Sequence, residues 1–132
     1  MSFASGAAPS GLLIVDDNVD LLHTLVDVIS DEGYRVLAAH DGREALAALR
    51  AANPLPCVIL LDLAMPEMNG EEFRMEQLRD PVLARIPVVG FTADLARGYR
   101  LGEMQVDEIV RKPVSLDYLL SVIERYCGTK SA

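Results

Sequence analysis

Side chains that could bind a metal ion and a phosphoryl group follow four of the short apolar stretches of the sequence. Asp16 and Asp17 come directly after one stretch, and Asp62 comes directly after another. Thr92 and Lys112 end two further stretches. Carboxylate oxygens are ligands that Mg²⁺ prefers, whereas hydroxyl and ammonium groups donate hydrogen bonds to phosphate oxygens. Together these residue types favour a phosphoryl-binding site in which a metal ion and a lysine neutralise charge during transfer.

The apolar stretches alternate with helical patterns along the chain, which is typical of a parallel sheet covered by helices. We expect strands over residues 12–15, 34–39, 57–61, 86–91 and 108–111. Helices are expected after Asn18, after an Asp41 cap, after the loop 63–70, at about 94–103 and from Ser115 onward, the last with a buried stripe of Leu116, Leu119, Leu120 and Ile123. Right-handed crossovers turn this order into a doubly wound α/β sheet with helices on both faces.

The carboxyl ends of all strands in such a sheet lie at one edge, where ligands bind. Taken singly, each polar residue also has an ordinary role: an aspartate caps a helix or starts a turn, and a lysine before a proline is usually solvated. At a common edge, however, three carboxylates would repel each other unless a cation lay among them. An open site of oxygen ligands therefore predicts Mg²⁺.

With these motifs in place, the chain resembles a response-regulator receiver domain of two-component signalling, similar to single-domain chemotaxis regulators. The matching segments are LLIVDDN (12–18), VILLDLAMPEMNG (58–70), IPVVGFTA (86–93) and RKPV (111–114). The resemblance covers residues 11–127. It implies a flavodoxin-like, five-stranded sheet with strand order 2-1-3-4-5 and a role as a phosphoacceptor in bacterial phosphorelays.

The resemblance also implies a role for each site residue. Asp62 would accept the phosphoryl group as a nucleophilic carboxylate, with Mg²⁺-dependent self-phosphorylation and autodephosphorylation in a signalling domain that is not otherwise an enzyme. Thr92 and Lys112 would bind phosphoryl oxygens. The ligands of Mg²⁺ would be Asp17 directly, Asp16 mainly through water, Asp62, and the backbone carbonyl of Ala64. Pro113 matches a family proline that commonly follows a cis peptide bond.

The implied partners are a sensor histidine kinase or histidine phosphotransfer protein and a downstream protein target, with the chain a monomer or a phosphorylation-dependent dimer. One departure concerns the output: the family usually has Tyr or Phe where this chain has Ile109. The segment between Thr92 and Lys112 also looks about two residues short, with Gln105 where a glycine is common. We therefore expect residues 92–106 to carry the conformational switch.

Composition limits the other possibilities. The formal net charge of −8 argues against nucleic acid or an anionic membrane surface as the direct partner. No apolar stretch is long enough to cross a membrane, and residues 1–10 do not resemble a signal peptide, so we expect a cytoplasmic protein with residues 1–10 and 128–132 as disordered tails. Cys57 and Cys127 lack metal-site spacing, which predicts reduced, buried thiols.

Several alternatives remain at this stage. An aspartate-nucleophile phosphatase would usually have a second aspartate at Ala64, and a flavin-binding protein would not place Asp16 and Asp17 where its phosphate must bind. The serious alternative is a pseudo-receiver that is never phosphorylated and acts only by binding proteins. A stand-alone regulator and a receiver excised from a hybrid kinase are equally compatible with a sequence in which nothing follows residue 132.

Overall fold

The computed structural model describes residues 11–63, 70–93 and 106–128. In chain order the elements are β1 (Gly11–Val15), α1 (Val19–Asp31), β2 (Arg35–Ala39), α2 (Gly42–Ala51), β3 (Ile59–Asp62), α3 (Gly70–Arg79), the 3₁₀ helix η1 (Leu83–Arg85), β4 (Val88–Thr92), β5 (Glu108–Arg111) and α5 (Leu116–Cys127). The expected strands are all present, and the sequence analysis did not predict η1. The helix expected over residues 94–103 lies outside the described residues.

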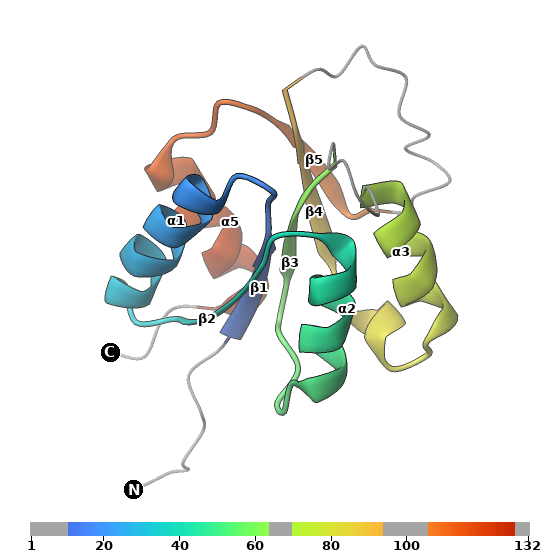
Figure 1. Cartoon of the computed structure of the whole chain (residues 1–132). Helices are drawn as coiled ribbons and strands as arrows, with labels where there is room; N and C mark the ends of the chain where they lie inside the picture. The colour runs from blue at the N-terminus through green and yellow to red at the C-terminus, as the bar shows by residue number, and fades with distance from the viewer. Residues whose placement is uncertain (1–10, 64–69, 94–105, 129–132) are drawn as a thin grey trace, which may run out of the picture.

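The five strands form one parallel sheet in the order β2-β1-β3-β4-β5, which confirms the expected doubly wound fold. Figure 1 shows α1 and α5 on one face of the sheet and α2 and α3 on the other. Side chains alternate between the two faces along each strand, so the sheet contributes to two hydrophobic cores. Leu13, Val15, Ile59 and Leu61 belong to the core under α2 and α3, whereas their strand neighbours belong to the core under α1 and α5.

Short polar side chains begin three of the helices. Asn18, Asp41 and Ser115 each accept a hydrogen bond from a backbone N–H in the first turn of α1, α2 and α5. The expected buried stripe of α5 is confirmed only for Leu119 and Ile123: Leu116 is 42% exposed, Leu120 is partly buried, and Val122 is fully buried instead. Leu116 is the first residue of the helix, beyond the part that lies over the sheet, whereas Val122 is one position before Ile123 on the same broad apolar face.

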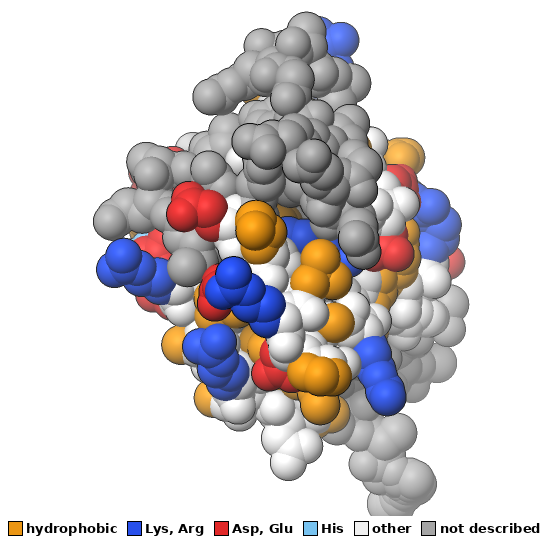
Figure 2. Space-filling view, turned by 90° about the vertical axis from the view of Figure 1, so that its right-hand side faces the viewer, with side chains coloured by type: hydrophobic (Ala, Val, Ile, Leu, Met, Phe, Trp, Pro, Cys, Tyr) orange, Lys and Arg blue, Asp and Glu red, His pale blue; other side chains and the backbone are white. Residues whose placement is uncertain are grey.

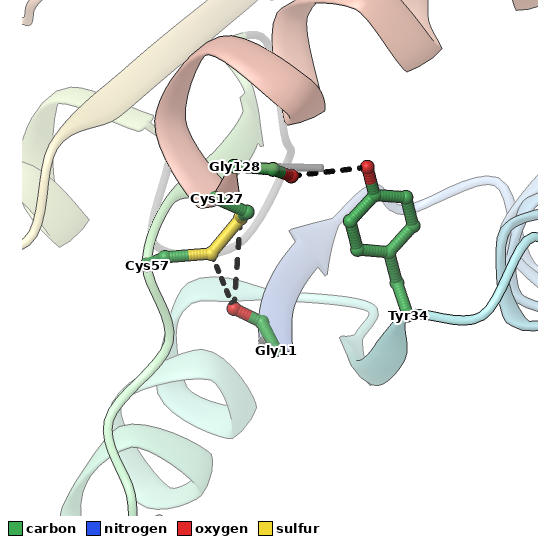
Figure 3. The surroundings of a disulfide bond; sticks show 5 residues. All are labelled: Gly11, Tyr34, Cys57, Cys127 and Gly128. Atoms are coloured by element: carbon green, nitrogen blue, oxygen red, sulfur yellow. Dashed lines mark hydrogen bonds between the residues drawn. A yellow bond between two sulfur atoms is a disulfide. The ribbon is translucent and has the colours of Figure 1, made fainter. Parts of the chain in front are cut away.

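The expectation of two reduced thiols is wrong, because Cys57 and Cys127 form a disulfide bond (Figure 3). Their separation of 70 residues conceals their proximity in space, where the Cα atoms are 5.3 Å apart. Cys57 precedes β3, and α5 runs back along the sheet until Cys127 reaches the same edge. Cα atoms at this distance are within the range that a disulfide spans.

One face of the molecule carries side chains of both charges where the structure describes it (Figure 2). On the face shown in Figure 2, basic and acidic side chains are interspersed and hydrophobic side chains lie between them. The described part of the face in Figure 2 is therefore not the continuous basic surface that nucleic acid requires. Among the described helices, none is both long and apolar enough to cross a membrane.

Gly90 in β4 packs tightly against the side chain of Leu63, which follows the end of β3. A Cβ atom at Gly90 would lie 2.9 Å from Cδ2 and 3.1 Å from Cγ of Leu63, which is only 2% exposed and follows Asp62 directly. We expect Gly90→Ala to lower the free energy of unfolding by about 1–3 kcal/mol, because Leu63 must move within a packed core. Urea unfolding followed by circular dichroism measures this change.

Gly11→Ala is the matched control, since its Cβ would meet its nearest neighbours at an ordinary 3.4–3.5 Å. It should change the free energy of unfolding by less than about 0.5 kcal/mol. Equal stabilities for the two variants would contradict the close packing of Gly90 against Leu63.

Candidate functional site

The register of the sheet brings the polar residues together at its carboxyl edge. Val15 pairs with Leu61, so Asp16 and Asp62 leave neighbouring strands at the same level. The backbone N–H of Lys112 donates a 2.7 Å hydrogen bond to the carbonyl of Thr92, which holds the ends of β4 and β5 side by side. The predicted convergence of these residues is therefore confirmed.

The ammonium group of Lys112 contacts two of the carboxylates. Its Nζ lies 3.3 Å from Oδ2 of Asp16 and 3.8 Å from Oδ2 of Asp62. Both aspartates are buried, at 6% and 7% exposure, whereas Lys112 is only partly buried and Asp17 is exposed. Two buried carboxylates and one lysine thus form a charged cluster that opens to solvent on the side of Asp17.

The three carboxylates can hold a metal ion together. One oxygen from each of Asp16, Asp17 and Asp62 lies within 4.8 Å of the others. Three carboxylates and the Lys112 ammonium leave two negative charges, which a divalent cation balances. Oxygen ligands with one side open to water suit Mg²⁺, which retains several waters when it binds to proteins. The residues present therefore fit the predicted ion.

Local hydrogen bonds orient Asp16 within this cluster. Its Oδ1 accepts a 2.9 Å hydrogen bond from the backbone N–H of Asn18, while its Oδ2 faces Lys112. Asn18 in turn caps α1 by accepting from the N–H of Leu21. The Asp-Asp-Asn sequence is thus both a helix start and a carboxylate site, two roles that the sequence alone presents as alternatives.

Thr92 ends β4 and is 1% exposed, so its hydroxyl belongs to the interior of this edge. The predicted carbonyl ligand, Ala64, lies outside the described residues. The peptide bond between Lys112 and Pro113 is cis, as expected.

An apolar cavity that the sequence did not predict opens beside the carboxylates. Its volume is about 410 Å³, and it lies between α1, α5 and the strand ends. Its lining includes Asp16, Asp62 and Lys112 together with the apolar side chains of Leu21, Leu25, Phe91, Val114 and Leu119. The available signal was the spacing of Leu21 and Leu25 on α1, four residues apart and therefore on one face of the helix.

Comparisons with known proteins agree with this geometry. The response regulator receiver domain model matches residues 12–124. A polar-differentiation response regulator, DivK of Brucella anthropi, is 30% identical over 122 residues, which cover 91% of this chain and 98% of DivK. The chemotaxis protein CheY4 of Vibrio cholerae superimposes with a TM-score of 0.81 at 28% identity, over 90% of this chain and 99% of CheY4.

A third relative shows the same fold at lower identity. The receiver domain of the sensor histidine kinase PA1611 from Pseudomonas aeruginosa, solved with a magnesium ion coordinated in its active-site cleft, has a TM-score of 0.80 at 24% identity. The match covers 92% of this chain and 99% of that domain. With the family model extending over most of the sequence and the carboxylates gathered at the sheet edge, the chain belongs to the response regulator receiver domains of two-component signalling.

Proposed function

We propose that this chain is a phosphoacceptor that takes a phosphoryl group on Asp62 from a histidine kinase or a histidine phosphotransfer protein. The observation that carries the proposal is the position of the Lys112 ammonium between Asp16 and Asp62, with Asp17 completing a cluster of three carboxylates. A nucleophilic carboxylate needs nearby positive charge to bring it close to an anionic donor, and this cluster provides one cation and a place for another.

In the proposed reaction, an Oδ atom of Asp62 attacks the phosphorus of the donor. The bond from phosphorus to the donor's imidazole nitrogen breaks, and an acyl phosphate forms on Asp62. Lys112 binds one phosphoryl oxygen and the Thr92 hydroxyl donates to another. Water later attacks the phosphorus and releases inorganic phosphate and the free carboxylate. Asp17 and Asp62, Asp16 mainly through water, and the backbone carbonyl of Ala64 would hold Mg²⁺, which would supply charge neutralisation.

The apolar cavity is the proposed contact for the phosphodonor protein. Leu21, which lines the cavity, is 38% exposed at the start of α1, and Leu116 is 42% exposed at the start of α5, so both helices offer apolar surface to a partner. An amphipathic helix of the donor could place its apolar face on α1 and α5 while its phosphohistidine reaches Asp62. We place the protein in the cytoplasm, where such donors present their phosphohistidine.

Output through a downstream protein is proposed to differ from the aromatic switch that is usual in the family. Ile109 is partly buried and packs against the core under α2 and α3. Its branched side chain is stiff at χ1 and has no polar tip, so it cannot exchange between a buried and a solvated position as tyrosine does. The segment after Thr92 is therefore the proposed switch, and its residues 94–105 lie outside the described part of the chain.

The phosphoacceptor is tested by treating the protein with acetyl phosphate and Mg²⁺. Intact-mass spectrometry should show one added phosphoryl group in the natural sequence and none in Asp62→Asn, because an amide oxygen is a far weaker nucleophile than a carboxylate. Asp31→Asn makes the same charge change at an exposed position of α1 and should be labelled normally. Labelling of Asp62→Asn would reject the assignment, and an unlabelled natural protein would favour the pseudo-receiver.

Metal binding is tested by thermal unfolding with and without Mg²⁺. The ion binds only the folded site, so a concentration ten times the Kd should stabilise the protein by about 1.4 kcal/mol. Asp17→Ala should fold normally, since Asp17 is exposed, but lose most of this increase. Asp27→Ala, at an exposed position within α1, is the control and should retain the Mg²⁺-dependent increase in stability. An equal response of both variants to Mg²⁺ would exclude Asp17 as a ligand.

The lysine is tested by Lys112→Arg, which keeps the positive charge. A guanidinium is a wide planar fork, whereas the ammonium is a compact charge that fits between two carboxylates. We expect normal unfolding but phosphorylation of Asp62 that is slower by on the order of tenfold, the effect of one lost charged hydrogen bond. A time course of intact mass measures this rate. Arg111→Lys, at an exposed neighbouring position, is the control and should leave the rate unchanged. Equal phosphorylation rates in the two variants would show that any positive charge suffices at position 112.

A further inference from the structure

Three segments of the chain meet at the amino edge of the sheet, at the end opposite the carboxylates (Figure 3). The disulfide joins Cys57, which precedes β3, to Cys127, the last residue of α5. The carbonyl oxygen of Gly11, the first residue of β1, lies 2.8 Å from Sγ of Cys57 and 3.9 Å from Sγ of Cys127. The amino end of β1 is therefore in contact with the bond that joins the other two segments.

Each of these segments is connected along the chain, directly or through a few residues, to a charged residue of the site. β1 ends immediately before Asp16, β3 ends at Asp62, and α5 begins four residues after Lys112. The strands are buried and extended, and α5 is a single helix about 18 Å long. A constraint at the amino edge therefore acts on β1 and β3, which end at Asp16 and Asp62, and on α5, which residues 113–115 connect to Lys112.

The surroundings of the pair accommodate both of its redox states. Cys57 and Cys127 are partly exposed, so a small thiol or disulfide reagent can reach them. After reduction either thiol has the Gly11 carbonyl oxygen near it as a hydrogen-bond acceptor. A disulfide in a reducing compartment is usually transient, as in catalytic and redox-sensing pairs.

Other contacts keep α5 in place when the disulfide is absent. Glu108 of β5 accepts hydrogen bonds from Arg125 at 3.0 Å and from the hydroxyls of Tyr118 and Tyr126, each at 3.3 Å. The Tyr34 hydroxyl also donates to the carbonyl of Gly128, just beyond the helix. Reduction should therefore loosen the end of α5 without detaching the helix from the sheet.

We propose that Cys57 and Cys127 form a reversible redox site whose state is transmitted to the phosphoryl site at the opposite edge of the sheet. In the oxidising direction, one cysteine thiolate attacks a low-molecular-weight disulfide and releases one thiolate, and the second cysteine displaces the other. Two cysteine thiols and one external disulfide thus yield the Cys57–Cys127 bond and two external thiols. The oxidised form holds β1, β3 and α5 in one arrangement, and the reduced form allows α5 to tilt.

The first experiment follows the redox state and the local stability of the full chain. The protein is equilibrated with mixtures of glutathione and glutathione disulfide, and alkylation with mass spectrometry counts the free thiols. Hydrogen exchange is then measured on the oxidised and the reduced forms. Amides of residues 15–18 and 111–116, at the carboxyl edge, should exchange about threefold faster after reduction, because local opening becomes easier. The Cys57→Ser, Cys127→Ser double variant should match the reduced form under all conditions.

The second measurement is the rate at which acetyl phosphate labels Asp62 in the two redox forms, and this arm depends on the proposed phosphoacceptor role. The oxidised form should be labelled about threefold faster, because its site is better ordered. Absence of labelling in both forms would count against the phosphoacceptor role alone, and hydrogen exchange would still decide the redox inference. Unchanged exchange at the carboxyl edge, or a pair that glutathione mixtures never convert, would overturn the inference and leave the disulfide a purely local crosslink.

Discussion

The ammonium group of Lys112 lies between two buried carboxylates that would otherwise repel each other at the edge of the sheet. Asp16 and Asp62 are side by side because β1 and β3 are parallel and in register. The fold itself therefore places two negative charges next to each other. In a partly desolvated setting such repulsion is much stronger than in water, and it must be balanced by positive charge. One lysine balances it only in part. The remaining negative charge favours the binding of a divalent cation among the three carboxylates.

The opposite end of α5 depends on a second charged contact. The Arg125 guanidinium donates to Glu108 and, with the tyrosine hydroxyls, holds the pKa of that carboxyl below its usual value. Glu108 begins β5, an edge strand, while Lys112 follows the end of the same strand. β5 and α5 are thus joined by hydrogen bonds near one edge of the sheet and by a short connection near the site at the other. These contacts add to the packing of Val110 against the core that α5 shares, and together they define the position of the helix on the edge strand.

Much of the fold and the site could be predicted from the sequence, because the determining signals are local. Apolar runs that end in Asp62 or Thr92 mark both a strand and the edge at which it stops, and Asp41 and Ser115 mark helix starts. What the sequence could not show depends on contacts between distant segments. To predict the disulfide between Cys57 and Cys127, one must know where α5 ends in space. The cavity likewise depends on the distance between α1 and α5, which are far apart in the sequence but lie on the same face of the sheet (Figure 1).

The disulfide also changes the covalent topology of the molecule. When it is formed, residues 57–127 make a closed ring that contains Asp62, Thr92 and Lys112, whereas Asp16 and Asp17 belong to the linear segment outside it. A protease that cuts one peptide bond within that ring would open it without releasing a fragment. Asp62, Thr92 and Lys112 would stay on one covalently connected molecule, and a thiol or another reductant would be needed to separate the two pieces. Backbone cleavage and loss of the site are therefore separate events in the oxidised protein and become coupled once the bond is reduced.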